Sequence, residues 1–344
     1  MGNSWNSEEL SLLAKYYGLM PVAEVAQKIP TRSIESIRTK GTRMGFGKRT
    51  TPRLHTPKLE YDEPLIDEDD ALADMWIKLQ DFQESQFNLK TYRDSVDIHV
   101  DTDTPIILGL ISDAHVGAPT GHYDELISRI DLMASTPKFY VASVGDTIDN
   151  YMPTSHASGM FNQLVPPSVQ KKLVEHQYMK LKGRWLAVVQ GCHDEWSYEA
   201  DEFDWSEYLS SRLECPNLGF GGFVNLTVGE QTYKLHLRHK YPRYNSSFNL
   251  THSVKRLREQ MGDFDIGVIA HNHQATIEQM VCGDGVDRLF VRTGSFKGAD
   301  RYSRQLGYND TGSCIPSVIL YPDERRMIPF LHLESAAIVH KSLI

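Results

Sequence analysis

Residues 105–117 read PIILGLISDAHVG, an apolar run that stops at Asp113 and His115. The arrangement returns further along the chain, where KFYVASV, RWLAVVQ, YKLHLRH and DIGVIA each stop at a cluster of Asp, His or Gly. Short apolar runs that alternate with helical segments are typical of an α/β domain with a buried sheet. Because side chains beyond the carboxyl ends of such strands converge, the pattern predicts an α/β fold with one polar site.

Polar side chains capable of binding metal follow these five runs in order. A single D-x-H or H-x-H would be weak evidence, because a buried histidine is usually a hydrogen-bonded core residue. Five successive clusters make a dinuclear metal site the better interpretation, and imidazole with carboxylate suits Mn, Fe or Zn. The clusters are Asp113 and His115, Asp146 and Asp149, Cys192 to Asp194, His239, and His271 and His273.

The order D-x-H, G-D-x-x-D, G-C-H-D, H and A-H-x-H resembles that of the calcineurin-like metallophosphoesterases, from about Pro105 to Tyr321. The resemblance implies a two-sheet α/β sandwich flanked by helices, with two divalent metal ions, expected to be Mn. It also implies that a hydroxide between the metals attacks phosphorus, that His193 protonates the leaving alkoxide, and that Asp149 orients His193. The implied ligands are Asp113, His115, Asp146 and His273 for the first metal, and Asp146, Cys192, His239 and His271 for the second.

Two positions depart from the family pattern. Ala270 replaces a glycine, which is a small-for-small change. Cys192 stands where the family has asparagine. As a thiolate ligand it would favour zinc or iron at the second site. The alternative is an unligated thiol, with the second metal weak or absent.

Further polar residues are candidates for contact with substrate. His122 and His156 follow the first two clusters in predicted loops, and Arg243 follows the fourth. Lys297 and Arg301 lie in TGSFKGADRYSR, where they are candidates for phosphate contact. Solvated loop charges explain the three basic residues equally well.

Charge is distributed unevenly along the chain. The net charge is -9, yet residues 1–55 carry nine Lys/Arg against four Asp/Glu, and residues 60–103 carry three against fourteen. A basic segment followed by an acidic one is typical of a binding module next to a connector.

The basic segment is predicted to form three short helices. Ser7 is expected to cap the first, Pro21 to open the second and Thr31 to cap the third. The third helix is expected to turn inward with its apolar positions Ile34, Ile37, Gly41 and Met44.

The three predicted helices resemble a Myb/SANT-like helix-turn-helix module. In such modules the last helix enters the DNA major groove and basic residues contact phosphates. The alternative is a small bundle that makes protein contacts. The candidate DNA-binding residues are Arg32, Arg38, Lys40, Arg43, Lys48 and Arg49.

These observations give a predicted domain organisation. A helix-turn-helix domain spans 1–50 and an acidic linker spans 51–104. The linker contains a helix at about 71–90 whose apolar stripe braces the next domain, and the metallophosphoesterase domain spans 105–344. The stripe consists of Leu72, Met75, Trp76, Leu79 and Phe82.

Composition excludes several classes of protein. Apolar residues make up 40% and charged residues 24% of the 344 residues, so a chain disordered throughout is excluded. The absence of a long apolar run and of a basic-then-apolar N-terminus predicts a cytoplasmic protein without a membrane partner. The four dispersed cysteines indicate neither a disulfide framework nor a zinc knuckle.

Three functions are compatible with the sequence. The favoured one is a metal-dependent DNA phosphodiesterase or nuclease. A homodimer is a candidate assembly, because helix-turn-helix modules often bind two half-sites. The second keeps the chemistry but acts on nucleotides or phosphoproteins. The third is a DNA-binding regulator with a decayed phosphoesterase domain.

Overall fold

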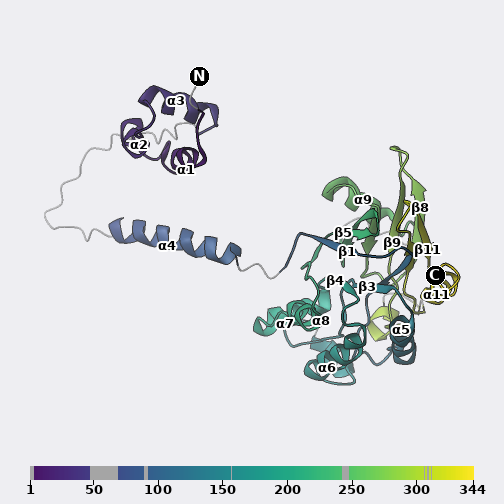
Figure 1. The fold of residues 1–344 in the computed structure, drawn as a ribbon. Coiled ribbons are helices and arrows are strands. Elements are labelled where there is room, and N and C mark those ends of the chain that lie inside the picture. Colours follow the sequence, from purple (N-terminus) through teal and green to yellow (C-terminus); the bar gives the residue numbers. More distant parts are fainter. Residues whose placement is uncertain are drawn as a thin grey trace. The chain divides into compact units, whose positions relative to one another are not determined.

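The computed structural model of the protein describes residues 4–46, 69–88, 92–155, 157–241, 248–305, 307, 310 and 312–344. The chain forms two compact units that divide between Lys78 and Leu79, within helix α4 (Asp69–Asn88). Figure 1 shows the helices and strands of both units in chain order. Each unit has a hydrophobic core of its own.

The N-terminal unit contains three short helices, and their apolar sides meet in a small core. The three helices predicted from the sequence are thereby confirmed. Their bounds are α1 (Ser7–Tyr16), α2 (Val22–Lys28) and α3 (Ile34–Arg43). The fully buried core residues are Leu13, Val25, Ile29 and Ile37.

The predicted caps of α1 and α3 are wrong by one and two residues. Asn6, not Ser7, caps α1: its side chain accepts from the Glu9 amide at 2.8 Å, and the Glu9 carboxylate accepts from the Asn6 amide at 2.9 Å. Ser33, not Thr31, caps α3. The hydroxyl of Thr31 donates instead to the Glu9 carboxylate at 2.7 Å, which removes it from capping.

Only the middle of α3 faces the core. Ile37 is buried, and Gly41 lies so close to the ring of Tyr17 that an added Cβ would approach it to 2.5 Å. Ile34 and Met44 were predicted to point inward, but they are 45% and 42% exposed. Both lie at the ends of the helix segment, beyond the reach of so small a core.

Helix α4 confirms the helix predicted over about 71–90, with a start two residues earlier. The predicted packing of its apolar stripe as a brace is not observed, because the five side chains are between 49% and 67% exposed. They are Leu72, Met75, Trp76, Leu79 and Phe82.

One sheet of the second unit has five strands in the order β11-β10-β2-β3-β4. Strands β2, β3 and β4 are parallel, so their carboxyl ends lie at one edge, while β10 runs antiparallel to both β2 and β11. The bounds are β2 (Ile106–Ile111), β3 (Phe139–Ser143), β4 (Trp185–Val188), β10 (Ser317–Leu320) and β11 (Met327–Phe330).

The other sheet has six strands in the order β1-β5-β6-β7-β9-β8, with β6, β7 and β9 parallel. Strand β1 pairs with β5, so this domain starts before the predicted boundary at residue 105. The predicted linker included β1 because this edge strand has only one buried residue and therefore lacks an apolar run. The bounds are β1 (Ser95–Val100), β5 (Gly221–Val228), β6 (Gln231–Arg238), β7 (Ile266–Ile269), β8 (Thr276–Val281) and β9 (Asp287–Arg292).

Helices cover the outer faces of the two sheets. Residues of α5, α6, α8 and α11 share a hydrophobic cluster with β2, β3 and β4, and α9 packs on β7 and β9 (Figure 1). The bounds are α5 (Tyr123–Ser135), η1 (Ala157–Asn162), α6 (Pro167–Tyr178), η2 (Met179–Leu181), α7 (Cys192–Asp201), α8 (Trp205–Leu213), α9 (His252–Met261), α10 (Arg301–Gln305) and α11 (Leu333–His340).

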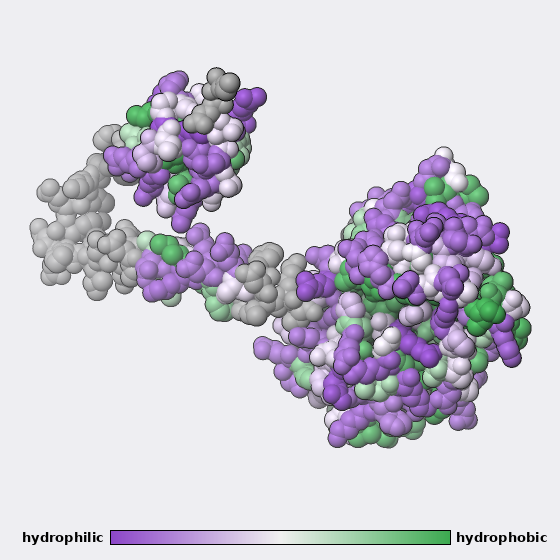
Figure 2. Space-filling view, viewed as in Figure 1, coloured by the Kyte–Doolittle hydropathy of each residue, from purple (hydrophilic) through white to green (hydrophobic). Residues whose placement is uncertain are grey.

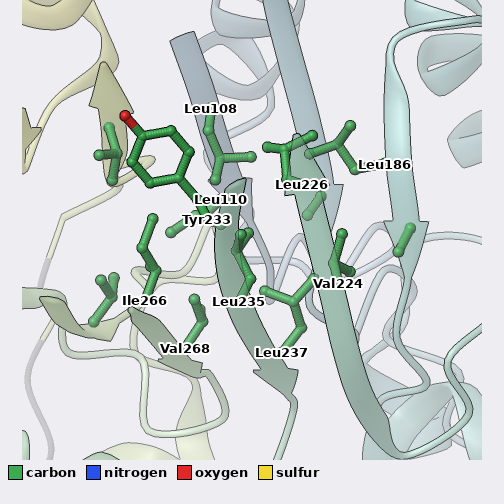
Figure 3. Close-up of a cluster of buried hydrophobic side chains, with 14 of the residues drawn as sticks. Leu108, Leu110, Leu186, Val224, Leu226, Tyr233, Leu235, Leu237, Ile266 and Val268 are labelled. Carbon is green, nitrogen blue, oxygen red and sulfur yellow. The ribbon is translucent and has the colours of Figure 1, made fainter. Parts of the chain in front are cut away.

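A hydrophobic cluster fills the space between the two sheets. Leu108 and Leu110 of β2 face this cluster together with Leu235 and Leu237 of β6, and all four are fully buried (Figure 3). Their spacing of two residues follows from the alternation of side chains along a strand. The two-sheet sandwich predicted from the sequence is therefore confirmed.

The surface of the second unit is mixed in character. Figure 2 shows hydrophilic residues over much of the visible face, with hydrophobic residues in scattered patches. Phe161 and Leu164, which precede α6, are 90% and 60% exposed. Among the described residues, no helix combines the length and the apolar character that a membrane span requires.

Candidate metal centre

Side chains at five strand ends meet at one place between the two sheets. Asp113 follows β2 and its Oδ1 lies 3.2 Å from Nε2 of His273, which follows β7. Asp146 follows β3 and its Oδ2 lies 3.1 Å from Nε2 of His239, which follows β6. Residues far apart in sequence thus converge because both sheets present parallel strands to the same edge.

The convergent residues form two groups of possible metal ligands. In each group the ligand atoms lie within 4.8 Å of one another. The first group is Asp113, His115 and His273, and the second is Cys192, His239 and His271. In the second, Sγ of Cys192 lies 3.8 Å from Nδ1 of His271.

Asp146 lies between the two groups. It forms one close set with Asp113 and His239, and another with His115 and His193. Its Oδ2 is 3.1 Å from His239 and 3.8 Å from His115. A carboxylate within reach of both groups is the arrangement that a bridging ligand requires.

Buried polar atoms in these groups lack ordinary hydrogen-bond partners. Oδ1 of Asp113 and Nε2 of His239 are buried and make no hydrogen bond of normal geometry with any described residue. Leaving such atoms unsatisfied is costly, and a cation would satisfy both. The residues present therefore fit two divalent metal ions.

The backbone at the ligands is strained. Five ligands have positive φ angles between 42° and 73°, a region that non-glycine residues seldom occupy. Gly145, at φ 87°, precedes Asp146, and a Cβ there would lie 2.8 Å from Nδ1 of His239. Such strain concentrates at functional sites. The five ligands are Asp113, His115, Asp146, His271 and His273.

The electrostatics of the centre favour a positive charge beside Asp146. Burial raises the pKa of Asp146, but the neighbouring positive charge of His239 outweighs it and holds the pKa well below its usual range. Burial opposes protonation of His239, yet the Asp146 carboxylate raises the pKa of His239 well above its usual value. Without a bound metal ion, a proton on His239 thus supplies the positive charge that balances the Asp146 carboxylate.

His193 contacts Asp149, the residue named in the sequence prediction, through the main chain of Asp149. Its Nδ1 donates to the backbone carbonyl of Asp149 at 2.6 Å, since a carbonyl oxygen can only accept. The Asp149 carboxylate lies 3.4 Å from Nδ1 of His115. Asp149 therefore orients His193 through its main chain and a metal-ligand histidine through its side chain.

Lys297 was predicted to contact phosphate, but it is buried and paired. Its Nζ lies 2.8 Å from Oδ1 of Asp149 and 3.1 Å from Oδ2 of Asp300, and it is only 9% exposed. Burial lowers the pKa of Lys297, but the charge of Asp149 outweighs it and raises the pKa above the usual value. The lysine is thus paired with two carboxylates beside the centre.

The other predicted substrate residues are less informative. His122 caps α5 without a side-chain cap bond and lies 3.3 Å from the carboxylate of Asp310. His156 and Arg243 lie outside the described residues, and Arg301 begins α10 without a described side chain.

The candidate DNA-binding residues fall into three groups. Arg32 pairs with the Glu9 carboxylate through two hydrogen bonds of 2.8 Å, so it is used inside the N-terminal unit. Arg38 and Arg43 are exposed on α3, and Lys40 is partly exposed. Lys48 and Arg49 lie outside the described residues.

Sequence reasoning missed supporting residues around His193. Asn150, at φ 48°, donates through Nδ2 to the His193 carbonyl at 2.6 Å. Asp194 was named in the third cluster without a role, and it accepts from the amides of Thr147 and Gly191 at 3.1 and 3.0 Å. Two sequence signals could have identified these residues. Asn150 directly follows the G-D-x-x-D motif, and Asp194 directly follows His193.

Comparison with known proteins shows remote similarity. No protein-family model and no curated protein matches the sequence. Among solved structures, the chain is similar to a Vps29 complexed with Zn²⁺ from Entamoeba histolytica, with 13% sequence identity and a TM-score of 0.36. The match covers 65% of this chain and 98% of that chain. A predicted phosphoesterase from Streptococcus pneumoniae has 14% sequence identity to this chain and a TM-score of 0.32. The match covers 67% of this chain and 99% of that chain.

A calcineurin-like phosphoesterase from Bacillus subtilis has 10% sequence identity to this chain and a TM-score of 0.32. The match covers 64% of this chain and 85% of that chain. At such identities and TM-scores, the likeness does not identify an activity. The metal-ligand groups of this chain are those expected of a metal-dependent phosphoesterase.

Proposed function

We propose that the protein is a metal-dependent phosphodiesterase that hydrolyses DNA. The single observation that carries the proposal is the position of Asp146 between the two ligand groups. A carboxylate shared by two such groups is the feature of two-metal hydrolases. A site for one structural ion would not need a second ligand set.

The ligands divide into two sets. Asp113, His115, Asp146 and His273 would hold one cation, and Asp146, Cys192, His239 and His271 the other. Two divalent cations, with Mn the first choice for the imidazole and carboxylate set, would lower the pKa of bound water and neutralise charge on the phosphate. Asp149 supports the first set through its 3.4 Å contact with His115.

His193 is the proposed proton donor to the leaving oxygen. Because the Nδ1 hydrogen is donated to the Asp149 carbonyl, the proton that is transferred to the leaving oxygen must be carried on Nε2. Burial lowers the pKa of His193 to about 3, so the free protein holds it neutral near neutral pH. An anionic phosphodiester beside the ring would raise that pKa, and binding would therefore be coupled to proton uptake.

The N-terminal unit supports the choice of DNA as substrate. Arg38 is exposed on α3, with a 60% exposed side chain that lies 3.7 Å from a Glu35 carboxylate exposed by 80%. Such an exposed pair is weak and would exchange readily for DNA phosphate. Lys40 and Arg43 lie on the same helix.

Hydrolysis assays with Mn²⁺ test the chemistry. Purified protein should cleave plasmid DNA or single strands, and Asp146→Asn should abolish cleavage and lower bound metal toward one ion or none. Metal content is measured directly by elemental analysis. Cleavage that persists without any divalent metal would refute the proposal, whereas hydrolysis confined to nucleotides or phosphoproteins would remove the DNA part.

Duplex binding at two salt concentrations tests the DNA part separately. Phosphate contacts make affinity fall with salt, so the triple variant Arg38→Ala, Lys40→Ala and Arg43→Ala should bind less tightly and show a shallower salt slope, by about one unit per lost contact. Glu24→Gln, an exposed change on α2, is the control. Equal affinity and slope in both variants would contradict a DNA role for α3.

A further inference from the structure

A hollow of about 360 Å³ lies in the segment that follows the second ligand cluster. This segment joins Asp149 to α6 and contains the short helix η1. The volume is at the lower end of the range for sites that bind small molecules. The lining includes Tyr151, Met152, Met160, Leu164, Val165 and Pro166.

The hollow is continuous with the proposed proton donor through Tyr151. The ring of Tyr151 lies 5.4 Å from that of His193 and 5.3 Å from that of Trp196. His193 and Trp196 are themselves 4.0 Å apart, centre to centre. Because His193 serves the leaving group in the proposed function, the hollow lies beside the leaving group.

Tyr151 is held firmly in this place. Nζ of Lys297 lies 5.2 Å from the centre of the Tyr151 ring, within the range of a cation–π contact. Gly159 of η1 packs so closely that a Cβ there would come within 2.3 Å of the Tyr151 ring. The wall shared by the hollow and the metal centre is therefore preorganised.

The chemistry of the lining is apolar. Its amide side chain, Gln163, is engaged with the protein: Nε2 donates to the Tyr151 carbonyl at 2.9 Å, and Oε1 accepts from the Tyr151 amide at 2.9 Å. Oε1 also accepts from Nε2 of Gln170 at 2.7 Å. Apart from the Tyr151 hydroxyl, the lining side chains thus provide contact area without hydrogen bonds directed at a ligand, which suits a flat ring and not a charged group.

We infer that this hollow holds the nucleobase of the nucleoside that leaves during hydrolysis. The inference rests on the proposed function, because the position of the leaving group follows from the role of His193. Contact without hydrogen-bond readout tolerates any base, since each base has an apolar face. The site would accept an unstacked base and therefore favour single strands or frayed ends over an intact duplex.

The test compares two single-stranded oligonucleotides that differ only at the nucleotide on the leaving side of one cleavable bond. One carries a base there and the other is abasic. We expect the ratio of kcat/KM, intact over abasic, to be about tenfold or more, because a base that stacks on an aromatic side chain such as Tyr151 adds to binding. Equal kcat/KM values would overturn the inference.

The variant Leu164→Asp places a charge in the lining at a side chain that is 60% exposed, so folding should be unaffected. It should reduce the ratio to near one. Leu331→Asp, at a leucine that is 39% exposed outside the hollow, is the matched control and should keep the ratio. A ratio unchanged by Leu164→Asp would also overturn the inference.

A binding measurement separates the two claims. Thymidine, which has no phosphate, should show saturation-transfer NMR signals with the metal-free protein, and Leu164→Asp should remove them. Thymidine binding without hydrolysis of any phosphodiester would refute the proposed function and leave the base site supported. Hydrolysis without thymidine binding would refute the base site alone.

Discussion

Nζ of Lys297, in the loop after β9, lies 2.8 Å from Oδ1 of Asp149, in the loop after β3. Both residues are buried, and the same Asp149 oxygen lies 3.4 Å from Nδ1 of His115. The lysine therefore connects a loop of the six-stranded sheet to a metal-ligand histidine of the five-stranded one. Carboxylates that contact ligand histidines in this way set their orientation and basicity.

Replacing Lys297 by methionine should destabilise the protein. The apolar stem is kept, but Asp149 is left as an unpaired buried charge, a change that costs about 3–5 kcal/mol. The double variant with Asp149→Asn should recover part of this loss in urea unfolding. Lys180→Met is the control, because its pair with Asp131 is partly exposed and should contribute less than about 1 kcal/mol. Equal losses for Lys297 and Lys180 would contradict the role given to Lys297.

Replacing Cys192 by asparagine should change the metal preference of the second site. A thiolate favours zinc, whereas an amide oxygen suits Mn, so zinc affinity should fall by more than about tenfold while Mn is retained. Cobalt substitution gives an independent readout, since a thiolate ligand produces a charge-transfer band in the near ultraviolet. Cys215→Ser is the control at a cysteine outside the centre. A cobalt spectrum that Cys192→Asn leaves unchanged would show that the thiol is unligated.

Replacing His193 by alanine should lower kcat by about 10² to 10⁴ without loss of bound metal. The reason is that, in the proposed function, His193 donates a proton and is not among the ligands of either metal set. The effect should be smaller for a substrate with an acidic leaving group, such as p-nitrophenol, which needs no proton. An equal loss for both substrates would argue against general acid catalysis.

The pair of Glu9 and Arg32 should make the stability of the N-terminal unit depend on pH. Hydrogen bonds from Arg32, and then from Thr31 and Asn6, lower the pKa of Glu9 to about 2 from its ordinary value near 4.5. A carboxyl group with a lowered pKa stabilises the fold fully above the unfolded value and loses that contribution as the pH falls toward the folded value. The stabilisation should therefore disappear progressively as the pH falls from about 4.5 to about 2.

Thermal unfolding of residues 7–43 in the full chain, followed by amide NMR signals, measures this dependence. Glu9→Gln should lower the midpoint temperature of unfolding near neutral pH. The difference in midpoint between this variant and the parent protein should narrow as the pH falls from about 4.5 to about 2. Glu24→Gln, at an exposed position on α2, should show no such narrowing. A difference that stays constant with pH would exclude the carboxylate as the cause.

The strand-end pattern alone was sufficient to predict an α/β fold with one polar site, and the two-sheet architecture and the division of the ligands came from the family resemblance. Each ligand stands directly after a short apolar run, as Asp113 follows residues 106–111 and His239 follows residues 231–238. That relation is local, and parallel strands bring their carboxyl ends to one edge in any order of the sheet. The structure places the expected ligands within reach of one another.

The tertiary structure alone decided which charges pair. Lys297 and Asp149 are 148 residues apart, and Arg32 and Glu9 are 23 apart, so no local pattern joins either pair. Both basic residues were predicted to bind phosphate because a free cation and a paired one are identical in sequence. The strand Ser95–Val100 was missed for a related reason, since only its neighbour β5 makes it a strand. Local periodicity records which side chains face a core, whereas Coulomb pairing depends on distances through space that exist only after folding.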